Sequence, residues 1–232
     1  MHVYAGIDLH SSNCYLGVIN QKQQRLFEKR LPNAMDQVRA ALKPFRKQLV
    51  GVAVESTYNW YWLVDGLQED GIRVHLANPA AMQQYDGLKH TDDRTDAIWL
   101  AKMLRLGILP EGYIYPKAKR PTRDLLRRRM LFVQQRTSHL LSLRALVERW
   151  TGRRLPANRI KQLSPEAAEA LFEPAHLALS ARCQLQTIGF LTGQIRAIEK
   201  AILAEMKLHL HFEVLTSVAG IGKILALTIM LE

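Results

Sequence analysis

Four acidic residues stand at positions where a folded chain normally places apolar side chains. Asp8 ends an apolar run near the N-terminus, and Glu55 ends a second such run. Asp93 and Asp96 lie three residues apart in a helical pattern, on the face that also carries Leu100. Carboxylates directed at a core repel one another, and they stay ionised at low cost only when a cation neutralises them. The pattern therefore predicts a site for divalent metal ions.

This set of acids suits phosphodiester chemistry. Two-metal cleavage needs hard cations roughly 4 Å apart, one that activates the nucleophile and one that stabilises the leaving oxygen. Magnesium and manganese ions prefer carboxylate oxygens and water as ligands. We therefore predict that Asp8, Glu55, Asp93 and Asp96 are catalytic residues and metal ligands, with Mg²⁺ or Mn²⁺ as cofactor.

Each acid also has a purely structural interpretation. A carboxylate at a strand end is frequently a helix cap or a salt-bridge partner, so neither Asp8 nor Glu55 establishes a site alone. Asp92 could cap the following helix, and it makes the helix assignment ambiguous by one residue. His10 is close to Asp8 in sequence, but a lone histidine is more often a surface or hydrogen-bonded residue than a catalyst. The prediction depends on the four acids together.

The elements around these acids predict an α/β domain with a mixed sheet. Three consecutive strands read as an antiparallel meander, and the strands and helices that follow alternate, which implies parallel pairing with right-handed crossovers. The expected strands are 3–9, 13–20, 24–31, 49–54 and 72–76. The expected helices are 34–47, 58–69, a short one opened by Asn78-Pro79, and a last one that holds Asp93 and Asp96 and ends near Arg105. Carboxylates at the ends of parallel strands reach the edge where α/β proteins place their sites.

Basic residues concentrate in the middle of the chain. The whole sequence has a net charge of +11, and the segment from Lys117 to Lys161 has fourteen Lys or Arg against two acids, so the remainder is close to neutral. Arginine dominates the segment, and its planar guanidinium suits phosphate, which favours a polyanionic partner. The alternative interpretation is a solvated coiled-coil face rich in arginine.

The second half of the sequence is typical of long helices. One basic helix is expected over 122–150. Apolar stripes at alternating three- and four-residue spacing are Leu126, Met130, Val133, Leu140 and Val147, and then Ile188, Leu191, Ile195, Ile198 and Ile202. They predict helices that pack as an antiparallel pair or between molecules. Further on, Gly220-Ile-Gly222 opens a helix and resembles the hairpin of helix-hairpin-helix DNA-binding motifs, with a plain tight turn as the alternative interpretation.

Length and composition favour an intracellular globular protein. The 232 residues, 48% of them hydrophobic, can bury a sizeable core, and no stretch approaches the roughly 18 apolar residues that span a bilayer. No secretory signal is evident at the N-terminus. The cysteines, Cys14 and Cys183, are far apart and show no metal-ligand pattern, so two reduced thiols are expected.

Three motifs resemble a known family. The segments Gly6-Ile-Asp8-Leu-His10, Val54-Glu55-Ser-Thr and Lys89-His-Thr-Asp-Asp93-Arg-Thr-Asp96-Ala97 look like the acidic tetrad of bacterial transposases of the insertion sequence one-ten group, which are similar to the Piv invertase. The resemblance implies an RNase H-like, RuvC-like fold followed by an all-α coiled-coil region. It divides the chain into a catalytic domain (1–108), a linker (109–121), a helical basic domain (122–210) and the start of a C-terminal transposase domain (211–232).

The same resemblance implies a function and partners. Members of the family carry out site-specific DNA recombination, guided where this is understood by a structured bridge RNA, and a serine in the C-terminal domain forms a covalent link to a DNA phosphate. Ser217 does not match that serine, so it is expected beyond residue 232, in a part that this sequence lacks. A homo-oligomer, dimer or tetramer, in the bacterial cytoplasm and associated with the nucleoid is expected, with no membrane partner.

The resemblance also assigns nucleic-acid contacts to the basic region and to the glycine turn. The expected contact residues are Lys119, Arg120, Arg123, Arg127, Arg128, Arg129, Arg136, Arg153, Arg154, Gly220, Gly222 and Lys223. Two other functions remain open on the sequence alone. One is a junction-resolving or structure-specific nuclease, which needs only acids, metal and water. The other is an RNA- and DNA-binding scaffold that oligomerises through its helices and has no catalytic activity alone.

Overall fold

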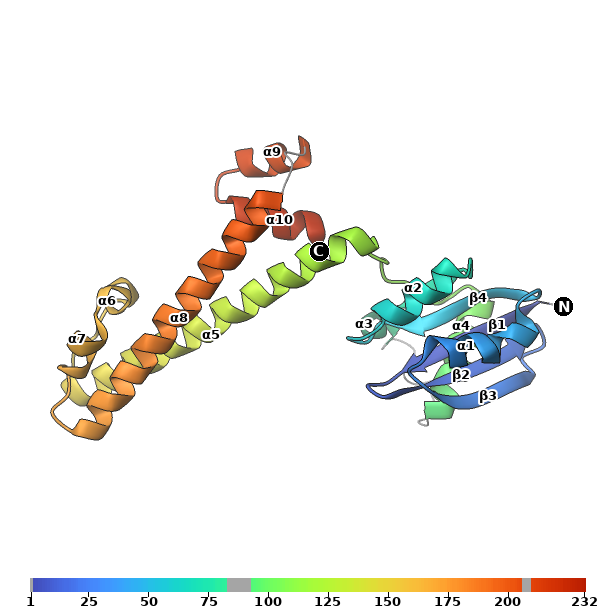
Figure 1. Ribbon diagram of the computed structural model, residues 1–232, viewed down its shortest axis with the longest axis horizontal. Helices are drawn as coiled ribbons and strands as arrows, with labels where there is room; N and C mark the ends of the chain where they lie inside the picture. Colours follow the sequence, from blue (N-terminus) through green and yellow to red (C-terminus); the bar gives the residue numbers. More distant parts are fainter. Residues whose placement is uncertain (1, 83–92, 206–209) are drawn as a thin grey trace. The chain divides into compact units, whose positions relative to one another are not determined.

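The chain folds into two compact units, residues Met1–Tyr115 and Pro116–Glu232. The computed structural model describes residues 2–82, 93–205 and 210–232, with the side chains of 93–95, 205 and 210 excepted (Figure 1). The division between the units lies inside the segment 109–121 that the sequence predicts to be a linker.

Unit 1 is built on a five-stranded mixed sheet. The strand order is β3-β2-β1-β4-β5, with β1 antiparallel to β2, β2 antiparallel to β3, and β1, β4 and β5 parallel. The strands are β1 (Val3–Leu9), β2 (Asn13–Asn20), β3 (Arg25–Pro32), β4 (Leu49–Glu55) and β5 (Val74–Ala77). The predicted meander and the predicted parallel half of the sheet are thus both confirmed.

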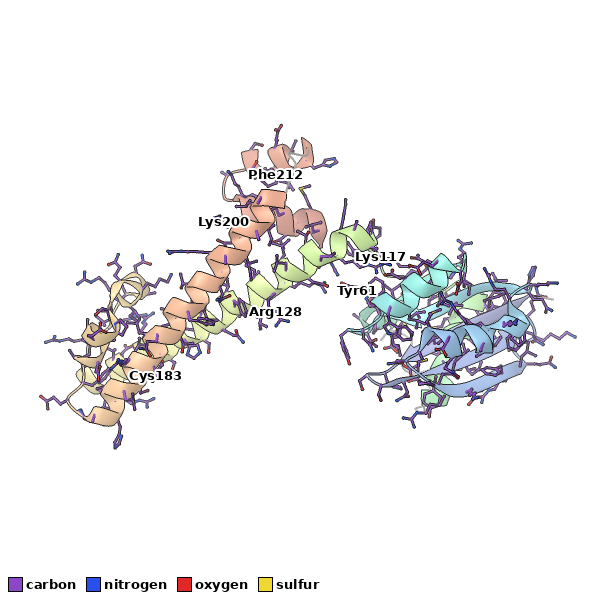
Figure 2. The ribbon with its side chains drawn as sticks, in the orientation of Figure 1. Tyr61, Lys117, Arg128, Cys183, Lys200 and Phe212 are labelled. Carbon is purple, nitrogen blue, oxygen red and sulfur yellow. The ribbon has the colours of Figure 1, made fainter. Side chains whose placement is uncertain are left out.

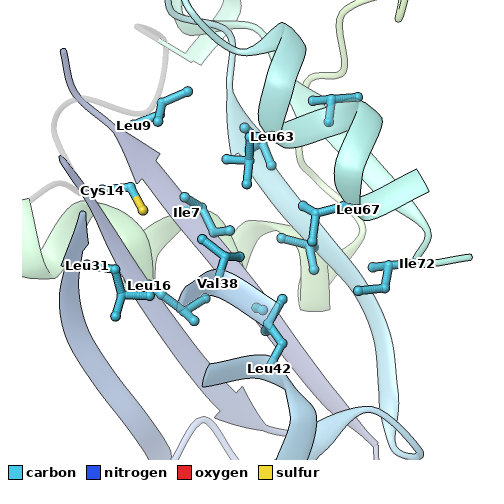
Figure 3. Close-up of a cluster of buried hydrophobic side chains, with 14 of the residues drawn as sticks. Ile7, Leu9, Cys14, Leu16, Leu31, Val38, Leu42, Leu63, Leu67 and Ile72 are labelled. Atoms are coloured by element: carbon cyan, nitrogen blue, oxygen red, sulfur yellow. The ribbon is translucent and has the colours of Figure 1, made fainter. Parts of the chain in front are cut away.

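One face of the sheet is covered by α1 (Met35–Leu42) and α2 (Tyr61–Glu69). Ile7 and Leu9 of β1 belong there to one buried cluster with Val38 and Leu42 of α1 and Leu63 of α2 (Figure 3). The predicted helix 34–47 is shorter than expected. Its α-helical part ends at Leu42 and a 3₁₀ turn, η1 (Lys43–Phe45), follows, because the proline in that turn has no N–H to continue the α-helical ladder.

The other face is covered by α4 (Asp93–Leu106), which packs on β1, β2 and β4. Gly6 and Gly17 are paired across β1 and β2 beneath this helix. A Cβ atom on Gly6 would lie 2.0 Å from the carbonyl oxygen of Ala97, and one on Gly17 would lie 2.7 Å from Cδ1 of Ile98. The paired glycines therefore allow α4 to approach the sheet more closely than any side chain would. The short helix α3 (Pro79–Met82) follows β5.

Unit 2 is entirely helical within the described residues. After the 3₁₀ turn η3 (Lys117–Lys119), the long helices α5 (Arg120–Thr151) and α8 (Ala175–Glu205) run antiparallel side by side (Figure 1). The shorter helices are α6 (Ala157–Gln162), α7 (Pro165–Glu169), α9 (Leu210–Ser217) and α10 (Lys223–Leu231). One cluster joins Leu143, Val147 and Ile188, and another joins Leu126, Ile202 and Phe212.

The apolar stripe predicted on the first long helix is only partly buried. Leu126, Leu140 and Val147 are buried, whereas Met130 is 45% exposed. At that level of α5 the neighbouring residue Arg129 faces α8, where it forms an ion pair with Glu199. Met130, one residue further round the helix, is consequently turned toward solvent.

Candidate metal and nucleic-acid site

The first two acids lie at the ends of neighbouring parallel strands. Ile7 of β1 is paired with Val54 of β4, so Asp8 and Glu55, the next residue in each strand, leave the sheet at the same edge. Side chains alternate between the faces of a strand, so Asp8 points to the same face as Gly6. That is the face covered by α4, and the strand ends therefore deliver both carboxylates beneath this helix.

The third acid comes from α4 itself. Asp96 immediately precedes Ala97, the residue whose carbonyl oxygen lies against Gly6. Asp96 is close enough to Asp8 to raise the pKa of its carboxyl group. Asp93 begins α4, one turn before Asp96, and its side chain lies outside the described residues. The structure thus brings together Asp8, Glu55 and Asp96 from β1, β4 and α4.

The environment of Asp8 is unfavourable for an ionised carboxylate. The residue is 4% exposed, and its pKa rises from 3.8 to about 7. Burial is the largest cause; the charge of His10 opposes it, and the charge of Glu55, a hydrogen bond to Glu55 and the charge of Asp96 add to it. Three acids from separate elements therefore share one electrostatic environment, and a proton or a cation stabilises it.

A histidine that the sequence alone leaves without a role belongs to this site. Nε2 of His10 lies 3.2 Å from Oδ2 of Asp8. The side-chain amides of Asn33 and Asn59 donate to the carbonyl oxygen of His10 at 2.9 and 3.0 Å, which fixes the backbone after β1. The sequence signal for this role is the two-residue spacing of Asp8 and His10, because residues two apart on an extended chain point to the same side.

The donor set fits a hard divalent cation. The groups are carboxylate oxygens, which Mg²⁺ and Mn²⁺ prefer, and burial together with the charges of Glu55 and Asp96 raises the pKa of Asp8, so a cation there would favour its ionised form. Within the described part of the chain, no group of three or more His, Cys, Asp or Glu side chains lies close enough together to hold a metal ion. The side chain of Asp93, the fourth predicted ligand, is not among the described side chains.

A comparison with protein families decides the identity of this fold. The family model for DEDD transposases of the IS110 group, described as a transposase, matches residues 5–151. The chain belongs to this family. No match was found among curated proteins. Its mixed sheet with flanking helices is accordingly the RNase H-like, RuvC-like fold predicted from the sequence, and membership implies DNA transposition or recombination with DNA as partner.

The basic residues of this DEDD transposase occupy three different environments. Arg120 and Arg123 are buried, at 4% and 9% exposure. Arg123 donates to the carbonyl oxygen of Leu231 and to Glu232, so it holds α10 against α5. The phosphate contacts predicted for these two arginines stay predictions, at side chains that are buried in this structure.

Other arginines are engaged in ion pairs at the surface. Arg127 donates two hydrogen bonds to Glu232, at 2.6 and 2.8 Å. Hydrogen bonding to Arg127 is the main reason why the pKa of the Glu232 carboxyl group lies below its ordinary value. Arg129 binds Glu199 at 2.6 Å. These contacts join residues that are far apart in sequence. The predicted contacts that remain exposed are Lys119, Arg128, Arg153 and Arg154, with Arg136 half-buried.

The predicted glycine turn joins α9 to α10. Gly220 has a φ of +91°, which a residue with a side chain rarely adopts, and Gly222 is the N-cap of α10. Gly220, Gly222 and Lys223 are all exposed. The transposase thus has a helix-turn-helix segment with an accessible helix N-terminus at this point. No helix in the described residues combines the length and hydropathy required to cross a membrane.

Proposed function

We propose that this DEDD transposase recombines DNA with the help of Mg²⁺ or Mn²⁺ held by Asp8, Glu55, Asp93 and Asp96. The observation that supports the proposal is the convergence of three of these carboxyl groups from β1, β4 and α4, with the pKa of Asp8 raised to about 7. A structural acid at a strand end normally has a hydrogen-bonding or cationic partner that lowers its pKa. Asp8 shows the opposite shift, which is typical of a functional site.

Each residue of the site has a defined task in this proposal. A bound divalent cation supplies a Lewis acid that polarises a phosphodiester and neutralises the developing charge. Asp8 and Glu55 present oxygen donors from strands that the sheet fixes in position. α4 excludes water from the back of Asp8, and Asp96 brings a third donor from the helix. His10 stabilises the ionised form of Asp8 when it is protonated.

We propose that the exposed basic residues of unit 2 hold nucleic acid. The residues are Lys119, Arg128, Arg153, Arg154 and Lys223, together with the backbone of Gly220 and Gly222. Phosphate neutralisation of this kind gives affinity that falls with salt and depends little on base sequence. The bound molecules would be DNA and a structured bridge RNA that pairs with it. A dimer or tetramer and a serine nucleophile outside residues 1–232 complete the proposal, as the family resemblance implies.

The proposal is tested by recombination between donor and target DNA in the full-length transposase with its RNA. Asp8→Asn and Glu55→Gln should abolish product and leave RNA binding unchanged, because they remove charge without changing side-chain shape. Asp36→Asn, on the exposed first turn of α1, is the matched control and should retain activity.

The other outcomes separate the alternative functions. An unaltered recombination rate in Asp8→Asn would reject the catalytic assignment. Metal-dependent nicks without joined products would favour a junction-resolving nuclease. RNA and DNA binding without any cleavage, in parent and variants alike, would favour a scaffold.

A further inference from the structure

A groove runs along the two long helices of unit 2. Its walls come from α5, α8 and the segment that joins α6 to α7, and its volume is about 730 Å³. Leu185, Ile188 and Ile195 of α8 form a buried apolar floor. A space of this size accommodates a ligand of small-molecule dimensions.

Positively charged side chains surround the groove. Arg129 and Arg136 contribute from α5, Lys161 from α6 and Arg196 from α8, whereas Glu199 is the one acid in the lining. Arg129 donates to Oε1 of Glu199 through both Nε and Nη2, at 2.9 and 2.6 Å, so the charges of these two residues cancel. The other three cations form no ion pair with the described side chains. The groove therefore attracts an anion.

Arg136 is the most informative of these cations. Its Nε is buried and has no hydrogen-bond partner in the described protein. A buried donor without a partner costs free energy, which a ligand acceptor would recover. The guanidinium fork matches the oxygens of a phosphate group better than an ammonium does.

Two glycines keep the groove open. Gly189 and Gly193, one turn apart on α8, both line it. A Cβ atom on either would have no neighbour within 4 Å, so packing does not require glycine at these positions. Glycine weakens a helix interior relative to alanine. Two glycines at these positions, beside cations without ion-pair partners, leave space in the groove for a bound molecule.

We propose that this groove binds the phosphodiester backbone of a single-stranded segment of nucleic acid. The cations match phosphate, the apolar floor suits the sugar, and a space of small-molecule size takes a piece of one strand rather than a duplex. The inference rests on the proposed function and deepens it, because it assigns one strand to a defined place in unit 2. It also gives Arg136 a different task from the exposed arginines.

Binding of fluorescent single strands of about twelve nucleotides to the 232-residue chain tests the proposal. Oligo-uridine and oligo-thymidine are the two arms, and the tighter one identifies the source of the strand as RNA or DNA. Arg136→Gln should weaken binding about tenfold, the effect of losing one charge-assisted hydrogen bond. Lys200→Gln removes the same charge from an exposed position of α8 outside the groove (Figure 2) and should change affinity less than about twofold.

Two further variants separate the groove from general charge. Gly193→Leu adds volume without removing charge; it should weaken binding and leave the melting temperature equal or higher, since leucine is the better helix former. Glu199→Gln should tighten binding, because it releases Arg129.

The outcomes distinguish this inference from the function on which it rests. Weaker binding in Arg136→Gln and Gly193→Leu, with Lys200→Gln unchanged, supports the groove. If the parent binds and the two groove variants bind equally well, the groove is rejected and the proposed function stands. If the parent binds neither strand, the groove is rejected, and binding of duplex DNA by the same chain then decides whether the nucleic-acid contacts of the proposed function stand.

Discussion

Gly6 of β1 lies against Ala97 of α4 so closely that a Cβ atom on the glycine would stand 2.0 Å from the carbonyl oxygen of Ala97. This contact determines the distance between helix and sheet. Asp8 is two residues after the glycine on the same strand face, and Asp96 is the residue before the alanine. The contact therefore determines how close the two carboxyl groups come, and the packing of α4 is part of the chemistry of the site.

Substitution of Gly6 by alanine should separate α4 from the sheet. The added methyl group meets backbone atoms, which cannot move aside as the end of a side chain can. We expect unit 1 to lose about 1–3 kcal/mol of unfolding free energy, as in other overpacked cores. Urea unfolding in a Trp150→Phe background, where all remaining tryptophans lie in unit 1, measures the loss.

Gly112→Ala is the matched control for this substitution. A Cβ atom at Gly112 would meet Leu76 at ordinary contact distances of 3.7 Å and more. It should leave stability within about 0.5 kcal/mol of the parent. Equal stability of Gly6→Ala and Gly112→Ala would contradict the close approach.

The raised pKa of Asp8 predicts that metal-free protein becomes less stable as the pH increases. The carboxyl group has a pKa of 3.8 when unfolded and about 7 when folded, so between these values the folded state binds more protons. Stability from this group is thus fully present below pH 4 and is lost as the pH rises through 7, by about 2–4 kcal/mol. In Asp8→Asn this pH-dependent contribution should vanish. If the unfolding free energy of that variant fell between pH 4 and 7 as much as that of the parent, Asp8 would not be its source.

Removal of His10 should move the same transition to higher pH. His10 lies 3.2 Å from Asp8 and, when protonated, favours the ionised form of Asp8, so a neutral residue at position 10 leaves the charges of Glu55 and Asp96 unopposed. The ¹³C chemical shift of the Asp8 carboxyl carbon reports the midpoint in His10→Gln. His2→Gln, an exposed position outside the site, serves as control and should titrate like the parent. A midpoint that moves down in His10→Gln would exclude this role.

Magnesium should stabilise unit 1, and more strongly at high pH. A cation at Asp8, Glu55 and Asp96 competes with the proton that Asp8 retains up to about pH 7. At a Mg²⁺ concentration one hundred times the dissociation constant, the gain should be about 2.7 kcal/mol. Thermal unfolding at pH 6 and pH 8.5, with and without Mg²⁺, measures it. Glu55→Gln should lose most of the gain, and an equal gain in that variant would indicate binding elsewhere.

The sheet and its acids were predictable because their signals are local. An apolar strand that ends in a carboxylate is evident in the sequence, and parallel pairing then places Asp8 beside Glu55. The engagement of the arginines was not predictable in this way. Arg127 and its partner Glu232 are 105 residues apart, so their contact follows only from the packing of α10 on α5. The role of His10 likewise depends on amides that lie well beyond it in sequence.

Arg127 and Arg128 should therefore respond differently to the same substitution, although they are neighbours in one basic run. Arg128 is exposed on α5 (Figure 2), so Arg128→Gln should weaken binding to all nucleic-acid sequences and reduce the slope of log affinity against log salt by about 0.7–0.9. Arg127→Gln instead removes the two hydrogen bonds to Glu232 and should lower the stability of unit 2 by about 0.5–1 kcal/mol with a smaller effect on the slope. Salt titrations of nucleic-acid binding and urea unfolding of both variants distinguish phosphate binding by Arg128 from stabilisation of unit 2 by Arg127. Equal salt slopes for Arg128→Gln and the parent would remove Arg128 from the proposed phosphate contacts.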